Sequence, residues 1–107
     1  MPYFLVEAAY KEGAARAMVA HPHNRAEVVE KACQSLGGRL HSLFFAFGDF
    51  DVVTIVELPD NQAAAALALG VGATGALSKY RTTVLMTPDE AIAAMHRAGE
   101  ISYIPPQ

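Results

Sequence analysis

Histidines are the side chains of this sequence best suited to acid–base or metal chemistry near neutral pH. The densest group is His21-Pro22-His23, but proline fixes a loop there, and no cysteine or carboxylate stands beside it to complete a set of metal ligands. We therefore predict a solvated loop and no metal site. His41 falls in a strand-like run, where a partly buried imidazole can act as acid, base or ligand contact. The structural alternative for His41 is a hydrogen bond to backbone or solvent at a sheet edge.

Two carboxylates invite a paired acid–base mechanism. Asp51 and Glu57 share one face of a predicted strand, but six strand residues span roughly 20 Å at about 3.3 Å per residue. Carboxyl groups so far apart cannot share a proton or act on one glycosidic bond. The simpler interpretation is that Asp51 braces the hairpin before its strand. Glu57 is then expected to pair with Arg39, Lys79 or Arg81.

Arg25 and Cys33 fall on one predicted helix. Arg25 can hold an anionic ligand or form an ion pair, whereas Cys33 lies on the apolar stripe, where a thiol without a base behaves as a small hydrophobe. The glycines of residues 70–75 have the spacing of a dinucleotide fingerprint but follow a helix instead of a strand, so we reject that interpretation. The catalytic residues therefore stay unknown, and we expect no cofactor.

Aromatic side chains gather in residues 44–50, beside few polar groups. Small-molecule pockets are mostly apolar and carry a small number of polar contacts. We therefore predict a site for a small apolar or aromatic ligand. Its candidate residues are Phe45, Phe47 and Phe50, with Arg25, His41 and Asp51 as polar contacts.

The segments that must position these residues alternate between strand and helix patterns. Asn24 and the run Thr87-Pro88-Asp89-Glu90 are typical helix starts, and Gly37-Gly38 is a typical helix stop. A tight hairpin between two crossovers predicts an α+β fold, a ferredoxin-like βαββαβ sandwich with strand order 4-1-3-2 and an extra C-terminal helix. The predicted elements are a strand at 2–10, a helical turn at 14–20, a helix at 25–36, strands at 39–47 and 50–58, a helix at 61–69, a strand at 76–86 and a helix at 88–98.

The central hairpin is predicted to be apolar on both faces. Gly48-Asp49 suits a two-residue type II′ turn. Two helices cover only one face of such a sheet, so the other face would expose a large apolar patch to water. Such a patch normally marks an interface. We expect a second copy of the chain to cover it by sheet-to-sheet pairing; the alternative is that the C-terminal helix or tail folds over it. The strand register that this turn implies assigns side chains to the two faces. One face carries His41, Phe45, Val52 and Val56, and the other carries Phe44, Val53 and Ile55.

Composition narrows the class of protein. With 107 residues, 52% hydrophobic and 18% charged, the chain has the composition of one globular domain. A net charge of −3 without a basic run argues against a nucleic-acid partner, and the apolar runs are too short for a membrane span. The single cysteine allows no internal disulfide, and the first residues lack a signal-peptide pattern. We expect a cytoplasmic protein.

The run FAFGDFDVVTIVELPD at residues 45–60 resembles the signature of the GYD domain family. Similar features are LGGRL at 36–40, PDN at 59–61 before an alanine-rich helix, LMTPDE at 85–90 and the Tyr103 to Pro106 tail, so the resemblance covers residues 1–107 as one domain. It implies a ferredoxin-like subunit in a dimeric α/β-barrel assembly. Phe50 stands where the family name has tyrosine, so no role for a phenolic hydroxyl is carried over.

Three functions remain open. The leading hypothesis is a homo-oligomer that binds a small molecule without a cofactor, in a pocket between sheet and helices or at the subunit junction. The second is a cofactor-independent enzyme of monooxygenase or isomerase type, which the resemblance to dimeric α/β-barrel proteins suggests by analogy of fold. The third is a structural or regulatory interaction module, which would associate with itself without binding a metabolite.

Overall fold

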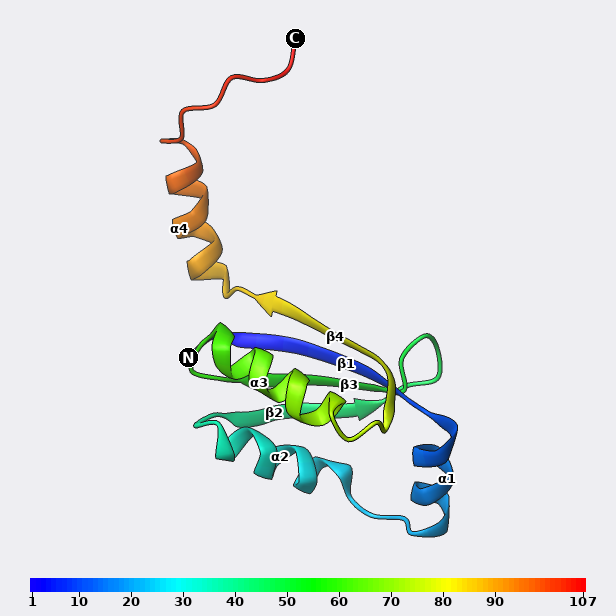
Figure 1. The fold of residues 1–107 in the computed structure, drawn as a ribbon. Coiled ribbons are helices and arrows are strands. Elements are labelled where there is room, and N and C mark those ends of the chain that lie inside the picture. Colours follow the sequence, from blue (N-terminus) through cyan, green and yellow to red (C-terminus); the bar gives the residue numbers. More distant parts are fainter.

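Four antiparallel strands form one sheet in the order β2-β3-β1-β4, and the helices α2 and α3 lie along one of its faces (Figure 1). This is the predicted strand order, and the fold is ferredoxin-like. No helix is long and apolar enough to cross a membrane. The computed structural model describes residues 1–107, in the order β1 (Tyr3–Tyr10), α1 (Glu12–Ala20), α2 (Arg25–Ser35), β2 (Arg39–Phe45), β3 (Val52–Glu57), α3 (Asn61–Gly72), β4 (Leu77–Leu85) and α4 (Pro88–Ala98).

The helix ends follow the predicted signals. The Asn24 side chain accepts a hydrogen bond from the Ala26 N–H at 3.0 Å, and Thr87 forms a complete capping box with Glu90. Beyond α2, Gly37 has a φ of 80°, the left-handed conformation that glycine adopts without steric cost. The segment predicted as a short helical turn at 14–20 is a longer helix, α1.

The hairpin register is confirmed near the loop, where Phe45 pairs with Val52, but the predicted two-residue turn is wrong. The strands end at Phe45 and resume at Val52, and residues 46–51 form a longer loop that projects from the sheet (Figure 1). Asp51 explains the difference. Its N–H donates to the Ala8 carbonyl at 2.9 Å and its carboxylate accepts from the Tyr10 N–H at 2.8 Å, so residue 51 is bonded to β1.

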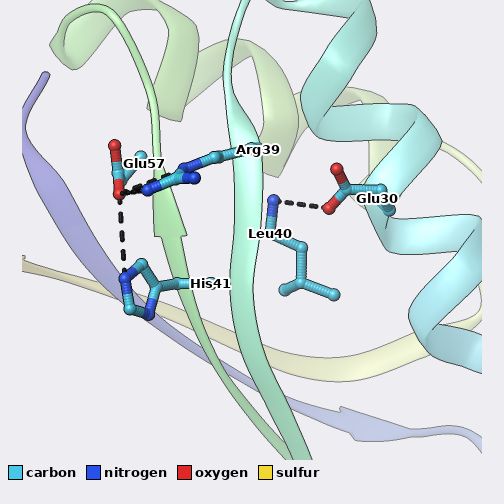
Figure 2. Close-up of polar contacts among 5 residues, drawn as sticks. All are labelled: Glu30, Arg39, Leu40, His41 and Glu57. Atoms are coloured by element: carbon cyan, nitrogen blue, oxygen red, sulfur yellow. Dashed lines mark hydrogen bonds and ion pairs between the residues drawn. The ribbon is translucent and has the colours of Figure 1, made fainter.

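The prediction that His41 shares a face with Phe45 and Val56 is also wrong. The β2–β3 register shifts between Leu40 and Ser42, and Leu40 takes the position opposite Val56. A bulge of one residue reverses the alternation of side chains, so His41 moves to the opposite face. Glu30 of α2 accepts a hydrogen bond from the Leu40 N–H at 2.7 Å, which satisfies this outward-facing group of an edge strand (Figure 2).

The core lies between the sheet and the helices α2 and α3. Phe4, Val56 and Cys33 are at most 1% exposed, and burying each of the larger side chains contributes about 1.5–3 kcal/mol. Because Phe4 and Val6 point to the helices, their neighbours in β1 must point the other way. The sequence prediction that one face meets the helices is confirmed, and that face carries Val52, Thr54 and Val56 of β3.

We call the other side of the sheet the open face. Phe44 is its most exposed large apolar side chain, at 69%. The helix α4 and the tail project away from the sheet (Figure 1). The alternative prediction, that they fold over this face, is therefore wrong for a single copy of the chain. The side chains of the open face are Tyr3, Leu5 and Glu7 of β1, Arg39, His41, Ser42 and Phe44 of β2, Val53, Ile55 and Glu57 of β3, and Lys79, Arg81, Thr83 and Leu85 of β4.

Candidate functional site

A cavity of about 420 Å³ lies between the helix-covered face of the sheet and the helices α2 and α3. Its lining comes from β1, β3, β4, both helices and the connector before β4, and 14 of the 19 lining residues are hydrophobic. This volume is in the range of about 300–1,000 Å³ that small-molecule sites occupy. The cavity is therefore large enough for a small ligand.

Short side chains leave this space empty. Ala66 and Gly70 of α3, Ala32 of α2 and Ala8 of β1 border the cavity, and none of them reaches far from its backbone. The alanine-rich segment 63–69 has two surroundings. Its first alanines, Ala63 and Ala64, are buried in the core, whereas Ala66 and Leu67 border the cavity.

Arg25 and Tyr80 are two of the few polar side chains that line the cavity, together with Tyr10 and the hydroxyl groups of Ser35, Thr54 and Thr74. The Arg25 Nε and the Tyr80 Oη are both buried, and neither makes a hydrogen bond of good geometry within the chain, although the Thr82 side chain lies near the Tyr80 hydroxyl. Leaving a buried polar group unpaired costs about 1–3 kcal/mol. Burial raises the pKa of Tyr80 to about 12, so its hydroxyl is protonated and available as a donor at neutral pH. Both residues border the cavity, and both atoms are donors that the protein itself does not satisfy.

Arg25 is held in place by the loop that precedes α2. Its Nη1 lies 2.9 Å from the Nε2 of His23, whose Nδ1 lies 2.9 Å from the His21 carbonyl oxygen. Because a carbonyl only accepts and a guanidinium only donates, we assign the proton of His23 to Nδ1. The loop was predicted to be solvated, and both histidines are exposed, but sequence reasoning missed that His23 positions Arg25.

Sequence reasoning also missed Tyr80. It is a lone aromatic in an edge strand, and nothing in the local pattern separates it from a packing residue. Only the fold shows that α2 and α3 leave a space above it. Cys33, in contrast, is the buried small hydrophobe that was predicted: it is 0% exposed, and burial raises the pKa of its thiol to about 11.

Asp51 lies outside the cavity lining but supports one wall of it. Its bonds to Ala8 and Tyr10 hold the end of β1, and both of these residues border the cavity. The bracing role predicted for Asp51 is confirmed. Direct contact between Asp51 and a ligand stays a prediction.

The three phenylalanines predicted to line a pocket do not border the cavity. Phe47 is fully exposed in the 46–51 loop, and Phe45 is 54% exposed on the edge strand β2. The Phe50 ring lies 4.7 Å from the Arg81 guanidinium and 5.5 Å from the Lys79 ammonium, measured from the ring centroid. One copy of the chain does not bring these rings together with Arg25, so their binding role stays a prediction.

A second polar centre lies on the open face (Figure 2). Arg39 donates from Nη2 at 2.8 Å and from Nε at 3.2 Å to the Oε1 of Glu57, which confirms one of the predicted ion pairs. The hydrogen bond from Arg39 holds the pKa of the Glu57 carboxyl below its usual range, against the opposing effect of burial. His41 Nε2 lies 3.8 Å from the same oxygen, and its ring meets that of Tyr3 edge to face.

The sheet separates the two centres. Arg25 belongs to the cavity on the helix-covered face, whereas His41 belongs to the open face. The candidate contacts predicted for one ligand are therefore split between two sides of the subunit. No group of three or more His, Cys, Asp or Glu side chains is arranged to hold a metal ion.

The solved structures that resemble this chain share its fold at low sequence identity. The crystal structure of FFRP-DM1 has a TM-score of 0.53 at 14% identity, over 80% of this chain and 100% of that one. The crystal structure of MtbAldR has a TM-score of 0.55 at 12% identity, over 80% of this chain and 52% of that one, so this chain spans about half of the length of MtbAldR. The crystal structure of TTHA0845 from Thermus thermophilus has a TM-score of 0.51 at 15% identity, over 81% of this chain and 95% of that one.

No curated protein matches the sequence. The sequence profile of the GYD domain, in contrast, matches residues 4–95, which include nearly all of the sheet and the helices that enclose the cavity. The resemblance predicted from residues 45–60 is thereby confirmed over most of the chain. The protein belongs to the GYD domain family.

Proposed function

We propose that this protein binds a small, mostly apolar ligand that carries one hydrogen-bond acceptor, such as a carboxylate or a carbonyl group. The observation that carries the proposal is the pair of unpaired buried donors, Arg25 Nε and Tyr80 Oη, in a cavity whose other walls are largely apolar. An acceptor on the ligand would offer these donors a partner, and its apolar body would occupy the remaining volume. A carboxylate would also form a charge-assisted hydrogen bond with the Arg25 guanidinium.

The lining of the cavity favours binding over acid–base catalysis. None of its residues is His, Asp, Glu, Lys or Cys, which are the usual proton donors and acceptors of active sites. Tyr80 is a poor base or acid at neutral pH because burial raises its pKa to about 12. The enzyme alternative would depend on His41 or Asp51, which lie outside the cavity.

Self-association through the open face is the second part of the proposal. This face carries Leu5, Phe44, Val53 and Ile55 without cover from the chain's own helices. An apolar patch of this kind normally marks an interface. A second copy that packs its own open face there would form the homo-oligomer of dimeric α/β-barrel type. The buried, unpaired Cys33 is compatible with the predicted cytoplasmic location.

Binding is tested with 2-naphthoate, which combines an aromatic body with one carboxylate, and with naphthalene, which lacks the acceptor. We expect titration calorimetry to show tighter binding of 2-naphthoate. Tyr80→Phe should weaken it roughly two- to ten-fold, the value of one neutral hydrogen bond, and Arg25→Met by about ten-fold or more. Naphthalene binding should be unchanged in both variants.

Matched controls separate the site from general effects. Tyr103→Phe and Arg16→Met make the same chemical changes at exposed positions away from the cavity, and they should bind 2-naphthoate like the wild type. Equal binding by all four variants, or no binding of either compound to the folded protein, would overturn the proposal. Self-association without any such binding is what the alternative of a purely structural module predicts.

A further inference from the structure

The C-terminal residues project from the body of the molecule. We call residues 88–107, which comprise α4 and the tail, the C-terminal arm. No residue of α4 is buried, and the molecule measures 57 × 34 × 22 Å (Figure 1). Its radius of gyration is 17.1 Å, whereas a compact chain of this length has about 13 Å. The arm accounts for this elongated shape.

The arm is amphipathic although it has no partner within its own chain. Ile92 and Met95, three positions apart in α4, form an apolar stripe with the alanines beside them, and the opposite side of the helix is polar. Ile101, Tyr103 and Ile104 continue the apolar character into the tail, and all five side chains are exposed. Because an isolated helix of this length is marginal in water, the stripe needs a surface to pack against.

The connection to the sheet is short and directs the arm away from its own chain (Figure 1). Only Met86 and Thr87 separate the end of β4 from the start of α4. Thr87 has an extended conformation, with φ −70° and ψ 160°, and its capping box with Glu90 and the Pro88 ring fix the first turn of the helix. This connection carries the arm away from its own sheet, so the partner surface is sought on another molecule (Figure 1).

The exposed area has the size that a protein interface requires. The chain exposes 7526 Å², whereas a folded monomer of this mass exposes about 5,800 Å². The excess of about 1,700 Å² exceeds the roughly 800 Å² that each partner buries in a standard interface. A second copy offers a complementary surface, because its open face also carries apolar side chains that nothing in its own chain covers.

Charge also favours a second copy. The arm carries Asp89, Glu90 and Glu100 against Arg97, a formal balance of 1 − 3 = −2. The strands of the open face carry Arg39, Lys79 and Arg81 against Glu7 and Glu57, a balance of 3 − 2 = +1. Opposite signs favour contact between the two surfaces. The same acidic arm would be repelled by an anionic membrane surface, which amphipathic helices bind through lysine and arginine.

We propose that the C-terminal arm of each copy packs against a second copy of this chain, on the side of that copy's open face. A two-fold arrangement would make the contact reciprocal, so both arms and both open faces would be covered at once. This inference rests on the self-association proposed above, but it assigns a separate role to the arm: the open face brings two copies together, and the arm holds them.

The test uses paramagnetic broadening between two samples of the full-length chain. One sample carries a nitroxide on the arm through Glu100→Cys, and the other is ¹⁵N-labelled wild type without a nitroxide. The native Cys33 is buried and its thiol pKa is raised to about 11, so labelling is directed to the introduced thiol. In a mixture we expect broadening of sheet amide signals in the ¹⁵N-labelled copies, which only contact between copies can produce.

Substitutions on the two sides of α4 provide the matched comparison. Ile92→Glu combined with Met95→Glu should abolish the broadening and weaken self-association by about ten-fold or more in sedimentation experiments. Ala93→Glu combined with Arg97→Gln makes the same change of −2 in charge on the polar side of the helix and should change neither result. None of these positions is buried, so circular dichroism should show an unchanged fold.

The possible outcomes distinguish this inference from the proposed self-association. If the protein is oligomeric but the mixture shows no broadening between copies, the arm does not engage a second copy and the inference fails alone. If the protein sediments as a monomer at about 100 μM, both the inference and the proposed self-association fail. A further sample carries both ¹⁵N and the nitroxide on the same chain and is diluted into unlabelled wild type. Broadening of sheet signals in that sample, with none in the first mixture, would mean that the arm folds back on its own sheet, which also overturns the inference.

Discussion

Single atoms define the chemistry on both sides of this sheet. On the helix-covered side, the Arg25 Nε and Tyr80 Oη are donors without acceptors. On the open side, the Glu57 Oε1 accepts two hydrogen bonds from Arg39 and lies within 3.8 Å of His41. The first arrangement calls for a ligand, whereas the second is satisfied by the protein itself. The proposed binding site is therefore the one that contains Arg25, and we interpret the Arg39–Glu57 pair as structural.

The Arg39–Glu57 pair makes stability depend on pH in a defined direction. Arg39 lowers the folded-state pKa of the Glu57 carboxyl, so the stabilisation is present above the unfolded-state value of about 4.3 and is lost as the pH falls through the lower folded-state value. We expect Arg39→Met to be less stable than wild type at pH 7. The difference between the two should shrink once the pH falls below about 4.

Urea unfolding at a series of pH values measures this difference. Arg16→Met is the control, because it removes the exposed Arg16–Glu12 pair of α1 and should cost little at any pH. A stability difference between Arg39→Met and wild type that stays constant from pH 7 to pH 3 would contradict the role given to Glu57.

At the scale of elements, the junction between α2 and β2 depends on two consecutive glycines. Gly37 supplies the left-handed residue, and the Gly38 N–H donates to the Cys33 carbonyl at 2.9 Å, which closes the helix end. A Cβ on Gly38 would lie 2.1 Å from the Glu57 carbonyl oxygen and 2.8 Å from Leu58 Cδ2. The junction can therefore lie against the end of β3 only because residue 38 has no side chain.

Gly38→Ala should accordingly destabilise the protein by about 1–3 kcal/mol, the usual cost of forcing extra atoms into a packed site. Gly48→Ala is the matched control, because nothing lies within 4 Å of its added Cβ and its φ is not positive. We expect a change of less than about 0.5 kcal/mol there. Urea unfolding monitored by circular dichroism compares the two, and equal stabilities would show that the close approach to β3 is not needed.

At the scale of the whole molecule, the chain's own helices cover the apolar side chains of one face of the sheet and leave those of the other face uncovered. Helices α2 and α3 cover the first and enclose the cavity, while α4 leaves the body at the end of β4 (Figure 1). The open face and the C-terminal arm are therefore both uncovered within a single copy. Association of copies is the arrangement that covers both.

Phe44→Glu tests the contribution of the open face. A charge at this position should oppose burial of the face, so we expect the oligomer to dissociate to monomers in sedimentation velocity at micromolar concentration. Phe47→Glu introduces the same change at a fully exposed position of the 46–51 loop and should leave the oligomer intact. If Phe44→Glu associates as strongly as Phe47→Glu, the open face is not the interface.

Local sequence signals determined the elements of this protein and their order. The caps at Asn24 and Thr87 and the stop at Gly37 depend on residues within a few positions of one another, so they can be recognised in the sequence. Strand order followed from the sequence of elements and the rules of chain connection. The buried Cys33 was also accessible, because it follows from the periodicity of a helix. The Arg39–Glu57 pair was one of three partnerships predicted for Glu57, and the register shift between Leu40 and Ser42 is what places these two residues opposite each other.

Only the tertiary structure decided the parts that depend on residues distant in the chain. The bonds of Asp51 to β1 replaced the expected tight turn, and the bulge at His41 reversed the face of a candidate site residue. The cavity exists because short side chains on three separate elements meet above Tyr80, and Arg25 reaches it from the start of α2. Residue spacing along the chain does not predict such contacts, because they arise from packing between elements that are far apart in the sequence.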